Sequence, residues 1–269
     1  MDPTEIDSHV FLVANDNQGG HADASGEAFV YNHQVNTILK QSLLLISFIG
    51  TIVVSLCLQF VSLRATPIEV PVLEVEGQSD QATPQGWELT THHGTAELAI
   101  VSQEIGPALK LHADKSSFFI QKEFNVDLRL TPWLVWQWKI TALPKQGDFT
   151  RTEQDDQPAQ LILAFSKRFW EIRKCVSYVW GNTAPIGTME DTAAGAFLPL
   201  IDVKAVVVRS GETDMDTWIS ESRNVFEDYK QLYGKEPESV VGIRIQINSQ
   251  HTEAQAESLW GRIAFKSTP

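Results

Sequence analysis

Two strongly apolar segments with the period of a β-strand, residues 133–141 and 159–165, constrain the fold of this chain more than any other feature. In the first, WLVWQWKIT, the side chains of Leu134, Trp136, Trp138 and Ile140 fall on one face, because successive strand side chains point to opposite sides. In the second, AQLILAF, Gln160 alone is polar. We therefore predict that both are central strands. The polar stretch between them is far longer than a hairpin turn, and such a loop inside a compact domain is usually functional or disordered.

Other short segments after residue 87 alternate in the same way, most clearly residues 241–248, VGIRIQIN. Residues 225–233 instead follow a helix period, with Asn224 at the N-cap position and Gly234 at the end. Many strands separated by turns, with one or two short helices, predict an all-β fold, an antiparallel β-sandwich or jelly roll over residues 87–269. The other predicted strands lie near residues 96–101, 109–112, 118–126, 203–208 and 259–266.

The chain before this domain divides into three parts. Residues 1–40 are polar and acidic, and we expect a disordered tail. Residues 43–63, LLLISFIGTIVVSLCLQFVSL, carry no charge and are long enough as a helix to span a bilayer core of ~30 Å. They predict a single transmembrane helix over residues 41–64. Residues 65–86 contain prolines and glutamates and predict an extended linker.

One face of the predicted transmembrane helix carries small and polar side chains at intervals of four residues: Ser47, Thr51, Ser55 and Gln59. Such a stripe allows close packing and hydrogen bonding between helices in lipid, which predicts a homodimer or a membrane partner. The alternative is that these side chains bond to carbonyls of their own helix.

The overall composition excludes several classes of function. A net charge of −13 argues against nucleic acid as a partner, since that needs a clustered basic face. The 2 cysteines cannot form a disulfide framework. Phosphate-binding loops, dinucleotide fingerprints and a nucleophile elbow are missing from the sequence, so no enzyme class is indicated.

Several blocks occur in an order that resembles a bacterial family, domain of unknown function 3047, across residues 87–266. The blocks are WLVWQWKITALP, Asp155-Asp156 before AQLILAF, VSYVWG, VVVRSG, ESRNVFEDYKQLYGKEP, VGIRIQIN and WGRIAF. The resemblance implies an exported protein with a galactose-binding-like jelly roll related to carbohydrate-binding modules. It places the N-terminus in the cytoplasm and the C-terminal domain in the periplasm or outside the cell, anchored in the cytoplasmic membrane. The chain departs from the family in having Asn-Ser-Gln-His-Thr at 248–252 and Gly261-Arg262 where acidic residues are common.

The candidate site residues fall into an acidic and an aromatic group. Asp155 and Asp156 could hold Ca²⁺ through their carboxylates, or could act as an acid/base pair, or could form structural ion pairs. An indole near a strand end can stack on a sugar ring or can close the end of a sandwich. Ligand-binding candidates of this kind are Trp180, Trp218 and Trp260, with Arg223 at the start of the helix, where ion pairing is the alternative.

Three functions remain open from the sequence. The first is a membrane-anchored, exported and non-catalytic module that binds a glycan or another polar ligand. The second is a structural or assembly protein of a membrane complex. The third is a hydrolase that uses the loop with Asp155 and Asp156, for which two carboxyl groups would have to converge in a cleft.

Overall fold

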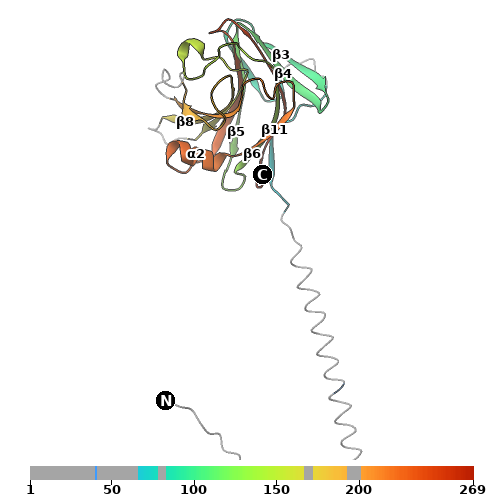
Figure 1. Cartoon of the computed structure of the whole chain (residues 1–269). Helices are drawn as coiled ribbons and strands as arrows, with labels where there is room; N and C mark the ends of the chain where they lie inside the picture. The colour runs from blue at the N-terminus through green and yellow to red at the C-terminus, as the bar shows by residue number, and fades with distance from the viewer. Residues whose placement is uncertain (1–39, 41–65, 78–82, 167–171, 193–200) are drawn as a thin grey trace, which may run out of the picture. The chain divides into compact units, whose positions relative to one another are not determined.

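A computed structural model of the chain describes residue 40 and residues 66–77, 83–166, 172–192 and 201–269 (Figure 1). The chain divides into two compact units, Met1–Ala65 and Thr66–Pro269, and the strands that the structure describes all belong to the second. The predicted tail (except Lys40), the transmembrane segment and its stripe Ser47, Thr51, Ser55 and Gln59 lie outside the described residues. Within the described part, no helix is long and apolar enough to cross a membrane.

The second unit is a sandwich of two β-sheets, which confirms the predicted β-sandwich. One sheet has six strands in the order β11-β6-β13-β4-β3, with β1 paired to β13, and the other has seven in the order β2-β5-β12-β7-β8-β10-β9. The first sheet contains β1 (Glu69–Leu73), β3 (Glu97–Gln103), β4 (Gly106–Asp114), β6 (Trp133–Ala142), β11 (Ile219–Asn224) and β13 (Gln255–Lys266). The second contains β2 (Glu88–His93), β5 (Ser117–Val126), β7 (Ala159–Phe165), β8 (Arg173–Gly181), β9 (Met189–Asp191), β10 (Ile201–Ser210) and β12 (Val240–Asn248).

The two segments that dominate the sequence are central strands, as predicted, but they belong to different sheets. β6 lies between β11 and β13, and β7 lies between β12 and β8. The loop between them therefore carries the chain from one sheet to the other, and it contains a short 3₁₀ turn, η1 (Thr152–Gln154). One strand pair differs from the predicted antiparallel arrangement: β8 and β10 run parallel. Parallel neighbours need a long crossover, and the chain passes through β9 before it returns as β10.

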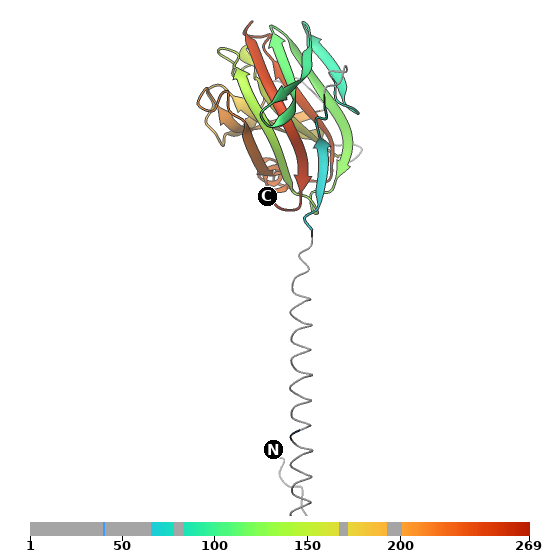
Figure 2. The same ribbon diagram turned by 90° about the vertical axis from the view of Figure 1, so that its right-hand side faces the viewer.

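The predicted linker is wrong for residues 69–73, which form β1 instead. This strand pairs antiparallel with the last four residues of β13, from Ile263 to Lys266, and Figure 2 shows the two side by side, β1 in cyan and β13 in red. Val72 and Leu73 are 5% and 1% exposed and belong to the core. The segment forms a strand because burial of its apolar side chains stabilises it, and its proline is tolerated because the strand lies at a sheet edge.

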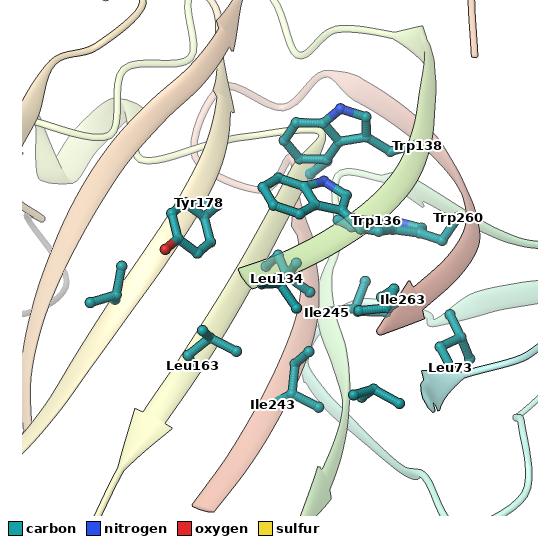
Figure 3. Packing of buried hydrophobic residues seen from close by; sticks show 14 of the residues in the cluster. Leu73, Leu134, Trp136, Trp138, Leu163, Tyr178, Ile243, Ile245, Trp260 and Ile263 are labelled. Carbon is teal, nitrogen blue, oxygen red and sulfur yellow. The ribbon is translucent and has the colours of Figure 1, made fainter. Parts of the chain in front are cut away.

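The core between the sheets contains a cluster of indole rings (Figure 3). The ring centroid of Trp138 lies 5.4 Å from that of Trp136, 5.6 Å from that of Trp180 and 5.5 Å from that of Trp260. Trp180 and Trp260 are 0% exposed. Of the two alternatives for these indoles, stacking on a sugar ring is wrong for Trp180 and Trp260, because both strands point them at the opposite sheet.

The helix α2 (Val225–Tyr233) forms where the sequence predicts it and lies against the sandwich (Figure 1). Asn224 Oδ1 accepts a hydrogen bond from the Glu227 N–H, and Gly234 ends the helix in the left-handed conformation, at φ 66°. The ring of Tyr229 packs 4.4 Å from that of Phe165, which fixes the helix to β7.

Candidate functional site

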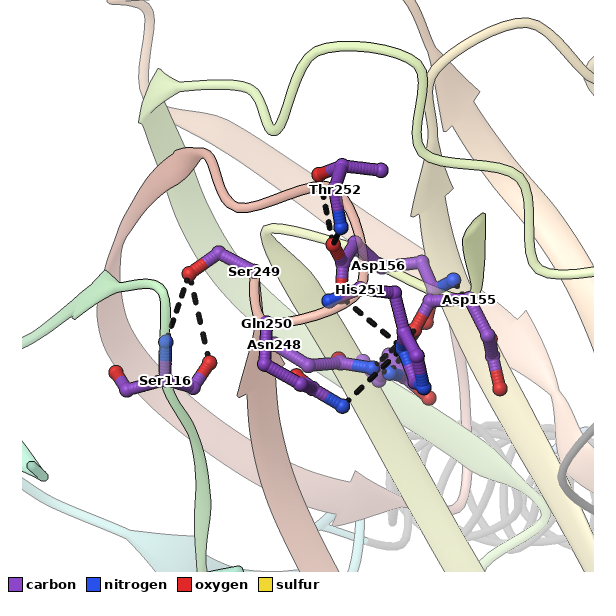
Figure 4. Close-up of polar contacts among 10 residues, drawn as sticks. Ser116, Asp155, Asp156, Asn248, Ser249, Gln250, His251 and Thr252 are labelled. Carbon is purple, nitrogen blue, oxygen red and sulfur yellow. Dashed lines mark hydrogen bonds and ion pairs between the residues drawn. The ribbon is translucent and has the colours of Figure 1, made fainter. Parts of the chain in front are cut away.

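The long loop between β6 and β7 meets the turn between β12 and β13 at one end of the seven-stranded sheet (Figure 4). The side-chain amide of Asn248 donates to the Asp155 carbonyl at 2.6 Å, and the Asn248 N–H donates to the Gln157 carbonyl at 3.1 Å. The structure therefore brings together two sequence features that lie far apart in the chain: the acidic pair and the stretch 248–252, where this chain departs from the resembling family.

Asp156 holds the turn in place. Its Oδ1 accepts from the His251 N–H at 3.2 Å, and its Oδ2 accepts from the Thr252 N–H at 2.6 Å and the Thr252 hydroxyl at 2.7 Å. The residue is 1% exposed. Since both carboxylate oxygens are used as acceptors by the turn, the geometry gives Asp156 a structural role.

Asp155 has a different environment, although it is the next residue. Its Oδ1 accepts from Gln157 Nε2 at 2.9 Å, and the residue is 9% exposed. The pKa of Asp155 is raised to about 6, chiefly by burial and to a smaller extent by the neighbouring carboxylates of Asp156 and Asp148. The hydrogen bond from Gln157 and the proximity of His251 act in the opposite direction.

Of the two carboxylates, that of Asp155 accepts fewer hydrogen bonds, since it has the one from Gln157 whereas Asp156 accepts three. Across the described ranges, no group of three or more His, Cys, Asp or Glu side chains is placed to hold a metal ion. The calcium site stays a prediction. The two carboxyl groups also do not converge on a cleft, because that of Asp156 points into the turn.

Two further candidates lie apart from this loop and from each other. Arg223 donates to both oxygens of Asp228, at 3.0 and 2.5 Å, and Tyr178 donates to the same carboxylate at 2.9 Å, so Arg223 joins α2 to the sandwich as an ion-pair partner. Trp218 is half-buried, with Lys139 Nζ 5.4 Å from its ring centroid, beside the six-stranded sheet.

A groove of about 940 Å³ lies on the outer face of the seven-stranded sheet. It crosses five adjacent strands, β5, β12, β7, β8 and β10, which at a spacing of ~4.8 Å gives a span on the order of 20 Å. Toward one end of the same face, Phe149 of the long loop covers Val179, Ala205 and Val207. The loop that carries the acidic pair thus covers one part of this face, and the groove occupies another.

Small side chains produce the hollow. Gly242 lies opposite Ala164, and Ala164 lies opposite Cys175, so three small residues form a row across three strands. A side chain at Gly242 would meet only ordinary contacts, the nearest being the Lys122 carbonyl at 3.5 Å. The backbone here does not require glycine, and its effect is to leave the floor of the groove open.

Two arginines reach into this groove. The guanidinium carbon of Arg244 lies 3.5 Å from the centroid of the Phe119 ring, and its Nη2 donates to Gln121 Oε1 at 3.2 Å. Arg173 Nη1 donates to the Phe165 carbonyl at 3.2 Å. Burial lowers the pKa of Arg244 from its ordinary value.

Other groups along the groove are mostly uncharged. Burial raises the pKa of the Cys175 thiol to about 11, so this group is neutral at pH 7. The lining also includes Gln121, Glu123, Ile162, Ser166, Ile201 and Val203.

The groove residues are not among the candidates predicted from the sequence, although the sequence contains a signal for them. In the alternating strand VGIRIQIN, the outward positions include Gly242 and Arg244. A charged side chain in the middle of a central strand, beside a glycine, indicates an outer face that is hollow and partly covered. Which other strands supply Arg173 and Gln121 depends on sheet order, which the alternation does not contain.

Together, these features define a β-sandwich with an open groove on one sheet. Residues 85–264 match the family described as Protein of unknown function (DUF3047), which is more than half of the chain, and the chain belongs to this family. No curated protein matches the chain in sequence.

Among solved structures, the chain is similar to a family 11 carbohydrate-binding module from Clostridium thermocellum in complex with a β-1,3-1,4-mixed-linked tetrasaccharide. The identity is 8%, the TM-score is 0.41, and the similarity covers 75% of this chain and 96% of that one. It is also similar to a thermostable cellulase derived from Cel12A of Rhodothermus marinus, with 11% identity, a TM-score of 0.41 and coverage of 74% and 100%. A third similar structure is the xylan-binding module CBM15, with 11% identity, a TM-score of 0.35 and coverage of 75% and 97%.

Proposed function

We propose that this protein is a non-catalytic binding module that holds a glycan chain in the groove of its seven-stranded sheet. The observation that carries the proposal is the groove itself: an open hollow of about 940 Å³ across five strands, with small apolar side chains in its floor and amide, hydroxyl and guanidinium groups along it. Ligand sites of this volume combine an apolar lining with a few polar groups that fix orientation. A sugar chain offers the matching surfaces, since each ring has apolar C–H faces and a rim of hydroxyl groups.

The chemistry of the groove supports binding without hydrolysis. Glycoside hydrolysis needs a pair of carboxyl groups flanking the scissile bond. The described lining contains one carboxylate, Glu123. The Asp155 and Asp156 pair belongs to the neighbouring loop, where Asp156 is committed to the turn.

The setting of the module is part of the same proposal. The uncharged segment 43–63 anchors the chain in the cytoplasmic membrane as a single span, with the N-terminus in the cytoplasm and the sandwich exported. Its stripe of Ser47, Thr51, Ser55 and Gln59 packs against a second copy or another membrane helix.

Filling the floor of the groove tests the binding site. Gly242→Phe adds a ring to the floor of the groove at a position where a Cβ meets only ordinary contacts, and we expect it to weaken glycan binding at least tenfold while the melting temperature is kept. Ser222→Phe is the matched control, because it adds the same ring at an exposed position of β11 on the other sheet. The measurement is titration calorimetry on the full chain in detergent, with ligands chosen by screening neutral and acidic oligosaccharides. If no oligosaccharide binds, or if Gly242→Phe binds as the wild type does, the proposed function is wrong.

A further inference from the structure

We infer that the groove selects glycans that carry carboxylate groups, with Arg244 and Arg173 as the residues that read them. This inference rests on the proposed function and specifies its ligand class. Its starting point is the pairing of arginines in the described part of the chain. Five of them have a carboxylate oxygen within 3.5 Å: Arg129, Arg151, Arg209, Arg223 and Arg262. Among the described residues, Arg173 and Arg244 alone have none, and both line the groove.

A shortage of acidic partners does not explain this. The chain has 34 Asp and Glu against 21 Lys and Arg, so carboxylates are in excess. Glu123 lines the same groove, yet it forms no ion pair with either arginine. Two unpaired guanidinium groups in one hollow of an acidic protein therefore indicate a binding site for a negative group.

Arg244 keeps its charge at a cost in free energy. The side chain is half-buried, and burial lowers its pKa because water no longer solvates the cation fully. A buried charge without a counter-charge destabilises the folded state. A ligand carboxylate would supply that counter-charge.

The guanidinium of Arg244 is also fixed in orientation before such a ligand binds. One flat face lies on the Phe119 ring, and Gln121 accepts from Nη2. Of the five N–H donors of an arginine, the remaining ones have no acceptor among the described residues. A planar fork that is fixed in this way matches the two oxygens of a carboxylate.

The spacing of the two arginines favours a chain over a single small anion. Arg244 on β12 and Arg173 on β8 are two strands apart and about four residues apart along the strands, which places their Cα atoms roughly 15 Å from each other. The row of Gly242, Ala164 and Cys175 runs between them. A glycan with repeated uronate residues can lie over these small side chains and reach both cations, and its hydroxyl groups can donate to Glu123.

The test compares two ligands that differ only at the carboxyl groups: oligogalacturonates, and the same oligomers with every carboxyl methyl-esterified and therefore uncharged. Affinities for the full chain in detergent are measured by calorimetry. We expect the acid form to bind at least tenfold more tightly than the ester. We also expect Arg244→Met, which keeps the contact with Phe119, to remove the preference without lowering the melting temperature. Arg262→Met is the matched control, because it removes the same charge from the other sheet, where Arg262 pairs with Glu69 at 2.7 Å, and the preference should remain.

Each outcome decides a different claim. Equal affinity for acid and ester, with both lost in Gly242→Phe, would refute carboxylate selection and leave the glycan groove intact. A sulfated glycan that binds as tightly as the oligogalacturonate would also refute selection for carboxylates. A preference for the acid form that survives both Arg244→Met and Arg173→Met would overturn the assignment of these residues. Absence of binding to any glycan would overturn the proposed function as well.

Discussion

Asp155 and Asp156 are adjacent in the sequence, yet their carboxyl groups serve different purposes. The carboxylate of Asp156 accepts two backbone N–H groups and one hydroxyl group from the turn at 251–252. The carboxyl group of Asp155 is nearly buried and accepts one amide N–H, so its charged form is poorly compensated. In an irregular segment, the side chains of adjacent residues can lie in different environments. Two adjacent acidic residues in a sequence therefore need not bind the same ligand.

The raised pKa of Asp155 predicts that the protein loses stability as pH rises. The pKa is 3.8 in the unfolded chain and about 6 in the fold, so the folded state binds the proton more tightly. This contribution is fully present below pH 3.8 and is lost as pH rises through about 6, and two pKa units correspond to roughly 3 kcal/mol. Asp155→Asn removes the titration and keeps an acceptor for Gln157. We expect it to melt several degrees higher than the wild type at pH 7, with the difference vanishing near pH 4.

Asp156→Asn serves as the contrast in the same melting experiment. It replaces a charged acceptor of three hydrogen bonds by a neutral one with a single oxygen, and we expect a lower melting temperature at pH 7. Parallel curves of melting temperature against pH for the wild type and Asp155→Asn would contradict the assignment of the titration to Asp155.

At the scale of single residues, the sequence predicts helix caps better than it predicts ligands. Asn224 and Gly234 have their roles because cap geometry is local. Whether an indole is buried or exposed depends on how the two sheets pack. Trp180 and Trp260 both contact Trp138 in the core. Arg244 was recognisable as an outward side chain, but its lack of a counter-charge is a property of its three-dimensional surroundings.

At the scale of elements, strand period predicts the strands well and their pairing poorly. The segments 133–141 and 159–165 are central strands. β6 pairs with the distant strands β11 and β13, and β7 pairs with the distant strand β12 and with β8, the next strand in the chain. Sheet order arises from contacts between distant segments, and the parallel pair of β8 and β10 depends on the path of the connection between them. The strand β1 was missed because proline and glutamate outweigh its few apolar residues in any local reading.

The strand β1 predicts where the folded domain must begin. The family match starts at residue 85, whereas β1 starts at Glu69 and adds Val72 and Leu73 to the core. A chain that begins at residue 85 would lose this burial, worth about 1.5–3 kcal/mol per large aliphatic side chain, and would expose an edge of β13. We expect it to melt well below a chain that begins at residue 66.

Circular dichroism melting of the two shortened chains measures this difference. Leu73→Ala in the longer one should give an intermediate melting temperature, since it removes part of the same burial. Equal melting temperatures for the chains beginning at residues 66 and 85 would show that β1 adds nothing to the stability of the sandwich.

At the scale of the whole molecule, the acidic surface and the groove have opposite electrostatic effects. A net charge of −13 repels a polyanion at long range. An acidic glycan must therefore be attracted by the local field of Arg244 and Arg173, and screening weakens interactions between exposed charges beyond ~8 Å at physiological salt. The negative net charge argues against nucleic acid as a partner. It does not argue against a local site at which two arginines bind the carboxylates of a ligand.

The proposed export of the sandwich domain can be tested by its orientation relative to the membrane. The 21 uncharged residues at 43–63 are long enough to span the bilayer, but Lys40 and Arg64 give one basic residue on each side, so charge alone does not orient the segment. A module that binds glycans in its groove must lie on the same side of the membrane as those glycans. We therefore predict that the part of the chain after Arg64 is exported. An alkaline phosphatase fused after Pro269, which is active only after export, should be active, and a fluorescent protein that folds only in the cytoplasm should stay dark at the same position.

Val53→Arg with Val54→Arg is the control, because a charge at the bilayer centre costs at least about 2.5 kcal/mol per residue and should abolish the export signal. Fluorescence without phosphatase activity in the unaltered chain would place the sandwich in the cytoplasm and remove the groove from any glycan outside.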